Sequence, residues 1–441
     1  MTKMVTGGRG LLVFCLGMVF TAGAWVWWER RTSPALTAAE LLETLPAVAG
    51  PSSTDKAVTT WAARARHDPK SVLAWTNLGD VLMQKSRETM DVAYYGRAEA
   101  AFLRALELSP DNTPAITGIA WVHGGRHEFE RSIEWARKAI AVDPNSHDAY
   151  GLLGDAAVEM GDYEAAFKHY QKMLDIRPDL SSYSRGAHLL FLTGDTRKAE
   201  WLMKKAIAAG AAHAENTAWC RAQLALMLWN TGALIPAEQA AEAGLAQAPT
   251  NYHLLAAMGR IKAARQDYDA SIEYYKQASA SAPHHEVVVA LGDLYSLLGR
   301  HDEALKQYAL VEVIHTANRA KGVKGSLELA RFYADHDQNL AEAVSIAEEE
   351  YKAYPNVVAA DTLAWCYYKR GRYPDAKRMI EKALERRTPD ATFLFHAGMI
   401  NEKLGDRPAA KRLLYQAVSL NPTFHPLFAK LATETLAKLG S

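Results

Sequence analysis

A unit of about 34 residues recurs along most of this 441-residue chain, and its period constrains the fold more than any other feature. Each unit has the length of two helices joined by a short turn. Small residues allow the two helices to approach closely, and a proline ends the second helix because it cannot continue the hydrogen-bond ladder. The clearest copy begins at His147. Its marker residues are Tyr150, Leu153, Gly154, Gly161, Tyr163, Ala166, Tyr170 and Pro178.

About ten such units follow one another between residues 72 and 422. A single helix pair cannot bury its apolar face, so stacking of neighbouring units must supply the core. The first unit is longer than the rest, with an insertion of about seven residues between its helices. Markers of the other units include Gly79, Pro144, Gly194, Gly232, Gly259, Gly292, Tyr333, Gly371 and Gly405.

The pattern resembles the tetratricopeptide repeat family over residues 72–422. This resemblance implies an all-α, right-handed superhelical solenoid of about ten helix-turn-helix repeats. Residues 423–441 are expected to form a C-terminal capping helix, because Phe424 to Leu439 is amphipathic. Residues 32–71 are expected to form a linker and a leading cap helix.

The resemblance also implies where a partner binds. In this family the first helix of each repeat lines a concave groove, and its ninth residue points into that groove. Mixed charge along these positions favours a polar or zwitterionic ligand, although packing inside the array is the alternative for the three tryptophans. The groove residues implied are Trp121, Asp155, His188, Leu226, Arg260, Asp293, Arg331, Trp365 and Met399, with Trp229, Asp361, Tyr368 and Phe395 at neighbouring places.

Residues 1–31 resemble a segment that targets a chain to a membrane. Leu11 to Trp28 carries no charge and is long enough to span a bilayer as an uncleaved signal anchor. A cleaved signal peptide is the alternative, because Ala22 to Ala24 supplies the small residues of a cleavage site. Both alternatives place the repeats outside the cytoplasm, in a periplasmic or extracellular location.

Composition excludes several classes of function. Lys plus Arg and Asp plus Glu both count 50, and this balance argues against nucleic acid as a partner. Three cysteines without a CxxC motif indicate neither a disulfide framework nor a zinc site. His123 and His127 have helical spacing, but Gly124 and Gly125 between them predict a solvated turn and no metal. No catalytic motif is present, so we expect no enzyme activity and no cofactor.

The sequence therefore predicts a scaffold or adaptor that binds a protein or peptide partner in its groove, outside the cytoplasm and tethered to a membrane by its N-terminal helix. Two alternatives stay open. One is a glycan-binding or polysaccharide-export repeat protein, in which tryptophans stack on sugars. The other is a factor similar to those of cytochrome c maturation, which present an unfolded client.

Overall fold

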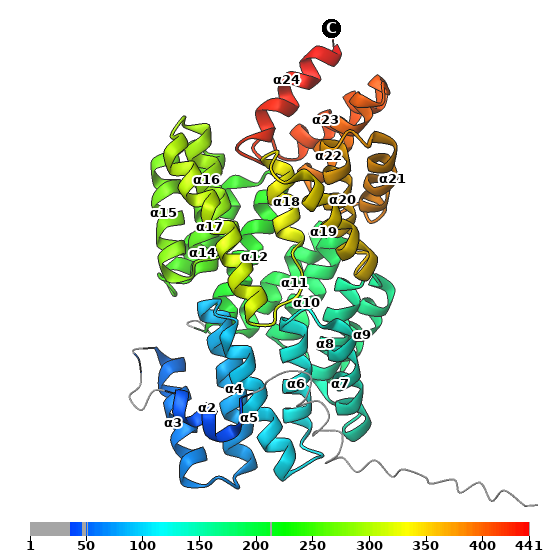
Figure 1. The fold of residues 1–441 in the computed structure, drawn as a ribbon. Coiled ribbons are helices and arrows are strands. Elements are labelled where there is room, and N and C mark those ends of the chain that lie inside the picture. The colour runs from blue at the N-terminus through cyan, green and yellow to red at the C-terminus, as the bar shows by residue number, and fades with distance from the viewer. Residues whose placement is uncertain (1–35, 46–49, 51, 212–213, 441) are drawn as a thin grey trace, which may run out of the picture.

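The computed structural model describes residues 36–45, 50, 52–211 and 214–440, and all its regular elements are helices (Figure 1). Ten consecutive helix pairs form its body, which confirms the predicted repeats. We name the first helix of each pair A and the second B. The pairs are α4 (Val72–Thr89) with α5 (Ala93–Leu108), α6 (Thr113–Gly125) with α7 (Phe129–Val142), α8 (His147–Glu159) with α9 (Tyr163–Ile176), α10 (Leu180–Leu192) with α11 (Thr196–Ala209), α12 (Glu215–Asn230) with α13 (Leu234–Leu245), α14 (Tyr252–Ala264) with α15 (Tyr268–Ser281), α16 (His285–Leu297) with α17 (His301–Ala320), α18 (Leu327–Asp335) with α19 (Leu340–Ala353), α20 (Val357–Lys369) with α21 (Tyr373–Leu384), and α22 (Ala391–Lys403) with α23 (Arg407–Leu420).

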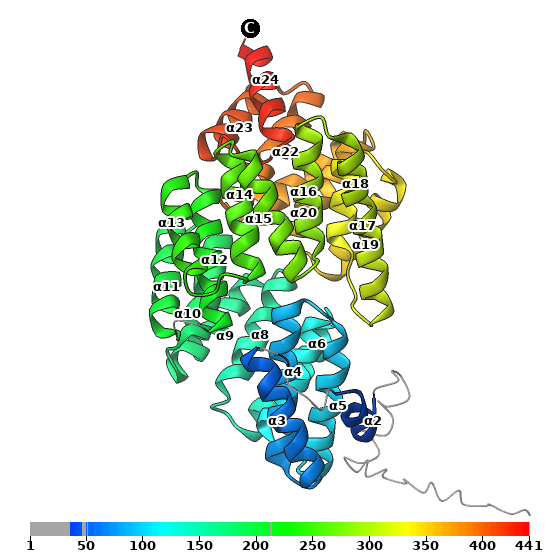
Figure 2. The same ribbon diagram turned by 90° about the vertical axis from the view of Figure 1, so that its left-hand side faces the viewer.

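Three further helices lie outside the pairs. Two of them, α2 (Ala38–Thr44) and α3 (Ser53–His67), precede the first pair, and α24 (Phe428–Gly440) follows the last. Helices α2 and α3 lie at one end of the array and α24 lies at the other (Figure 2). Among the described residues, no helix is both long enough and apolar enough to cross a bilayer. The predicted signal anchor or signal peptide, residues 1–31, lies outside the described residues.

The turn between an A helix and its B helix follows directly from the sequence. In the third repeat, Gly161 adopts φ 75°, the left-handed conformation that ends a helix at little cost to glycine. Asp162 comes next, and its side chain accepts a hydrogen bond from the backbone N–H of Ala165, which caps the start of α9. A Cβ at Gly154 would lie only 2.2 Å from the Tyr170 ring, so the small residue lets α8 and α9 pack closely.

The extra residues of the first repeat lengthen its helices instead of forming a longer loop. Helix α4 has 18 residues and α5 has 16, against 13 and 14 in α8 and α9. Met90 ends α4 in the left-handed conformation, with φ 54°. Arg87 lies in the last turn of the longer α4 and faces the interior of the superhelix.

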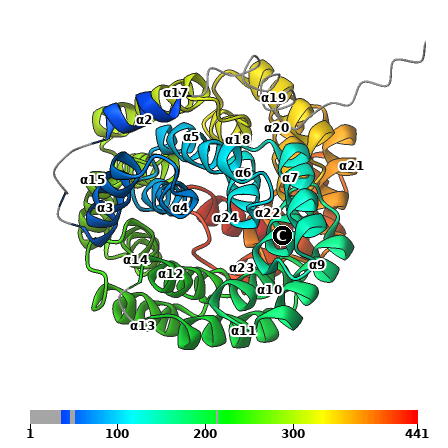
Figure 3. The ribbon, with the colours of Figure 1, turned by 90° about the horizontal axis from the view of Figure 1, so that it is seen from below.

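The repeats wind into a superhelix with A helices such as α10, α12 and α14 inside and B helices such as α11, α13 and α15 outside (Figure 3). Its successive turns touch. Three polar side chains that follow a B helix each donate a hydrogen bond to a carbonyl at the end of an A helix in the preceding turn. These bonds run from Asn356 Nδ2 to Glu159 O (2.9 Å), from Thr388 Oγ1 to Leu192 O (2.6 Å) and from Asn421 Nδ2 to Trp229 O (2.9 Å).

We call this line of contacts the inter-turn seam. Its partners are separated by 192 to 197 residues, roughly between five and six repeats of the family length. Last-turn carbonyls of a helix have no intrahelical partner, so the seam satisfies acceptors that would otherwise need water. The turn glycines lie against the same seam. A Cβ at Gly161 would lie 2.6 Å from the Pro355 carbonyl oxygen, and one at Gly232 would lie 2.7 Å from that of Leu420.

A pair of glycine substitutions tests the seam. Gly161→Ala and Gly371→Ala both place a side chain at positive φ, 75° and 73°, which costs roughly 1–2 kcal/mol. Only the first meets the seam, because no described atom lies within 4 Å of a Cβ at Gly371. We expect Gly161→Ala to lower the denaturation midpoint further and to increase the radius of gyration in small-angle X-ray scattering. Equal effects of the two variants would contradict a stabilising seam.

Candidate functional site

The A helices form the inner wall of the superhelix, and two cavities lie against it. The N-terminal cavity has a volume of about 1420 Å³ and is lined mainly by α4, α6, α8, α10, α12 and α14. The C-terminal cavity, of about 680 Å³, lies among α12, α14, α16, α18 and α20. Residues that follow α23 also line the C-terminal cavity, so part of the concave face of the later repeats is already occupied.

The occupying segment is the C-terminal tail, residues 421–440. Phe424 and Phe428 pack on Phe395 of α22, with ring centroids 5.6 and 5.3 Å apart. Phe428 also meets the ring of Trp365 from α20 edge-on, at 5.9 Å. Phe424 is 4% exposed and Phe428 7%, so this aromatic cluster is a true core. The tail therefore caps the array as predicted, but it does so from inside the channel.

Asp293 of α16 lies beside the same tail. This carboxylate is buried and accepts hydrogen bonds from Tyr308 Oη at 2.9 Å and from His336 Nε2 at 2.7 Å. His425 Nε2 of the tail lies 3.6 Å from its other oxygen. Burial disfavours a charged imidazole at His336, but the hydrogen bond and the charge of Asp293 raise its pKa. Asp293, predicted to face a ligand, is engaged by partners of its own chain.

The predicted groove residues of α20 and α22 are likewise enclosed. Trp365 is 2% exposed, donates its indole N–H to Asp335 at 2.8 Å and stacks on Tyr368 at 4.6 Å. Asp361 is fully buried and accepts a hydrogen bond from Arg331 at 3.2 Å. Together with Phe395, which is also fully buried, these side chains hold the last repeats and the tail together. For Trp365 the packing alternative describes the structure.

Trp229 and Arg260 border the C-terminal cavity. The Arg260 guanidinium lies over the Trp229 ring, 5.1 Å from its centroid, at cation–π distance. Trp229 itself is 7% exposed and belongs to a buried cluster with residues of α13 and α14, such as Ala237 and Met258.

Three predicted groove residues border open space in the N-terminal cavity: Trp121, Asp155 and His188. Asp155 pairs with Arg185 at 2.8 Å and accepts a hydrogen bond from Tyr170 Oη at 2.8 Å. His188 faces the channel, and enclosure by the channel walls lowers its pKa despite the nearby charge of Asp155. The ninth-residue rule therefore brings these three side chains to one cavity.

Other residues of this cavity were not predicted. Asp80 stands at the ninth place of the first repeat, so the same count finds it. Arg87 comes from the extension of α4, and Glu159 ends α8. Tyr252 and His253 reach the cavity because the superhelix brings α14 opposite α4, an arrangement without a local sequence signal.

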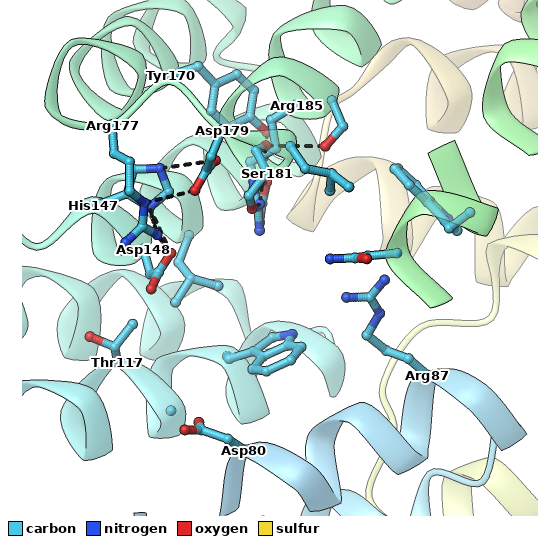
Figure 4. Close-up of a pocket in the computed structure, with 18 of the residues that line it drawn as sticks. Asp80, Arg87, Thr117, His147, Asp148, Tyr170, Arg177, Asp179, Ser181 and Arg185 are labelled. Atoms are coloured by element: carbon cyan, nitrogen blue, oxygen red, sulfur yellow. Dashed lines mark hydrogen bonds and ion pairs between the residues drawn. The ribbon is translucent and has the colours of Figure 1, made fainter. Parts of the chain in front are cut away.

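In the N-terminal cavity every positive side chain is paired with an opposite charge, but some of the negative ones are not. The cavity is lined by six carboxylates and three arginines, and every arginine has an acidic partner. Figure 4 shows Asp80 across the cavity from the cluster of His147, Asp148, Arg177 and Asp179. The arginine pairs are Arg87 with Glu215 (2.8 Å), Arg177 with Asp179 (2.8 Å) and Asp148 (3.4 Å), and Arg185 with Asp155 (2.8 Å).

Three carboxylates, Asp80, Asp143 and Glu159, have no cationic partner among the described residues, and Asp143 instead accepts a hydrogen bond from the backbone N–H of Asn145. Asp80 and Glu159 are open to the solvent of the cavity, but the cavity walls limit that solvent. This enclosure raises the pKa of Asp80 to about 7, with repulsion from Asp148 adding to the effect. Enclosure also raises the pKa of Glu159 to about 7, helped by Asp155 and Glu328. The surroundings of each of these two carboxyl groups therefore disfavour its ionised form.

The histidine pair of the second repeat differs from expectation. His123 is 2% exposed, and its Nδ1 lies 2.7 Å from Glu128 Oε2, so the prediction of a solvated turn is wrong for this side chain. Glycines 124 and 125 lie inside α6, which carries His123 into the interface with α7. Over the part of the chain that the structure describes, no three His, Cys, Asp or Glu side chains are placed to hold a metal ion.

A family model of the tetratricopeptide repeat matches residues 117–181, 256–320 and 362–423. The chain therefore carries tetratricopeptide repeats, and the resemblance drawn from the sequence is confirmed.

Similar proteins match in part. The chain is 28% identical over 105 residues to small glutamine-rich tetratricopeptide repeat-containing protein 2 of Mycosarcoma maydis, covering 24% of this chain and 30% of that protein. It is 24% identical over 265 residues to the CTR9 homolog of Arabidopsis thaliana, covering 55% of this chain and 23% of that one. The chain thus spans less than a third of either relative. The solved structure of Pseudomonas aeruginosa pilF has a TM-score of 0.38 and 17% identity, covering 51% of this chain and 97% of that one.

The tail predicts a specific loss of stability. Phe428→Ala removes a buried ring from Trp365 and Phe395, which costs about 3–5 kcal/mol in comparable cores. Tyr415→Ala on α23 is the control, because that ring is 63% exposed. We expect only Phe428→Ala to lower the denaturation midpoint and to shift the ¹⁹F resonance of fluorotryptophan at position 365. An unchanged resonance would contradict a tail packed inside the channel.

Asp80 predicts a pH-dependent effect on stability. Its pKa is raised from 3.8 to about 7 in the folded protein, so the folded state binds more protons than the unfolded state between these values. Stability therefore falls as pH rises from about 4 to 7, and the full penalty persists above pH 7. Asp80→Asn should gain thermal stability relative to the parent at pH 8 and little at pH 4. Glu134→Gln, on the exposed face of α7, should behave alike at both pH values, and a pH-independent effect of Asp80→Asn would contradict this account.

Proposed function

We propose that this chain is a scaffold whose N-terminal cavity binds an extended segment of a partner protein. The observation that supports this proposal is the cavity itself. Its volume of about 1420 Å³ exceeds the roughly 300–1000 Å³ of ordinary small-molecule pockets. Its walls come from consecutive A helices, so they offer a continuous surface along which a chain segment can lie. The proposal assigns no catalytic step to any residue.

The division of the channel supports the choice of cavity. In the later repeats the C-terminal tail covers part of the concave face, through Phe424, His425 and Phe428. In the first five repeats Trp121, Asp155 and His188 border open space. Among the described residues, the larger open wall therefore lies in the N-terminal half.

The location of the chain is also part of the proposal. The uncharged stretch from Leu11 to Trp28 supports a tether to a membrane, with the repeats on its extracytoplasmic side. A partner would then be a secreted protein, a surface protein or the exposed part of a membrane protein.

Site-specific photocrosslinking tests both parts. A photoreactive amino acid at Thr117, which lines the N-terminal cavity, should capture a discrete partner in living cells. The same group at Glu134, on the outer face of α7, is the control. Equal labelling from both positions would contradict binding in the cavity. Fractionation of the same cells should recover the full chain with membranes, and recovery only in the soluble cytoplasm would contradict the tether.

A further inference from the structure

The charge balance of the N-terminal cavity bears on the kind of partner that could bind there. All three arginines that line it are already paired with carboxylates of the chain, at 2.8 Å in each case. No lysine lines it. An acidic ligand would therefore find no free cation among the described lining residues and would have to displace an existing ion pair.

The lining charges without an ion-pair partner are all negative, and two of them, Asp80 and Glu159, lie at different levels of the cavity. Asp80 projects from the middle of α4, where its strongest electrostatic neighbour is Asp148. Glu159 is the last residue of α8, close to Asp155 and Glu328. At least one like charge thus lies near each carboxylate. A cation placed at either level would relieve this repulsion and pair with a group that the fold leaves without a partner.

A third residue favours a cation. Trp121 belongs to α6, the A helix between α4 and α8, and lines the same cavity at the ninth place of its repeat. Its side chain is half-buried. A tryptophan ring attracts a guanidinium or ammonium group that lies over its face. The wall thus offers a carboxylate, an aromatic ring and a second carboxylate on three consecutive A helices.

We propose that the N-terminal cavity selects partner segments that carry arginine or lysine side chains, which pair with Asp80 and Glu159. This inference rests on the proposed function, because it names the kind of segment that the scaffold holds. It differs from the mixed-charge ligand expected from the sequence. That expectation counted Arg260 and Arg331, which lie at the C-terminal cavity, together with residues of the N-terminal one.

The test uses the full chain in detergent micelles and three labelled, unstructured peptides of equal length. They differ only in four positions, which carry arginine, glutamine or glutamate. We expect fluorescence anisotropy at pH 8 and about 0.1 M salt to give at least tenfold tighter binding of the arginine peptide, or about 1.4 kcal/mol. The preference should weaken at pH 6, because both carboxyls then bind protons.

Variants locate the effect. Asp80→Asn and Glu159→Gln keep side-chain size and should each weaken binding of the arginine peptide severalfold, whereas Glu134→Gln should leave it unchanged. Asp80→Lys reverses the charge and should favour the glutamate peptide. A thermal melt of each variant confirms that it is folded.

The outcomes separate the two proposals. Equal binding of all three peptides, or tight binding of the arginine peptide that survives both neutral substitutions, would overturn the selectivity and leave the scaffold function intact. Failure of every peptide to bind, together with no capture by the crosslinker at Thr117, would overturn the scaffold function and this inference with it.

Discussion

Contact between successive turns of the superhelix is the constraint on which the rest of the structure depends. A stack of repeats in which each contacts only its neighbours leaves pitch and curvature to many small adjustments. Here Asn356, Thr388 and Asn421 bond across the turn to carbonyls of α8, α10 and α12. Three repeats in succession use the same device, so the pitch is fixed along a line. That pitch decides which A helices face one another, and it brings α14 opposite α4 to close the N-terminal cavity.

The repeats could be predicted because their signals are local. Gly161 must end one helix at positive φ, Asp162 caps the next, and Gly154 makes room for Tyr170, all within one unit. The seam could not be predicted, because its partners are nearly 200 residues apart and only the completed winding brings them together. The tail shows the same limit. Its apolar residues predicted a capping helix from Phe424, but the helix begins at Phe428, after Pro426, and the preceding segment enters the channel.

The candidate site divides along the same boundary. Counting to the ninth residue of each A helix locates Trp121, Asp155 and His188 on an open wall, and the same count would have located Asp80. In the later repeats it locates residues that are buried, such as Trp365. The register of a helix can be counted from sequence, whereas what lies opposite that helix cannot. The charged residues that look mixed along the sequence therefore fall into two regions of the structure. In the C-terminal region the tail contacts the wall, whereas the N-terminal region has more carboxylates than cations.

The seam has a topological consequence for anything held inside the channel. The backbone N–H of Lys324, after α17, also donates to the carbonyl of Arg126, so the loops after α17, α19, α21 and α23 all contact the turns of repeats two to five. These contacts join neighbouring coils along the seam. The C-terminal tail fills part of the other end of the channel. The coils would surround a bound segment on all sides, so the segment would enter by a free terminus or as a narrow hairpin. Its release would depend on sliding back along the axis or on parting the coils. The lifetime of such a complex would thus depend on how easily the coils of the superhelix separate, as well as on the contacts between the segment and the channel.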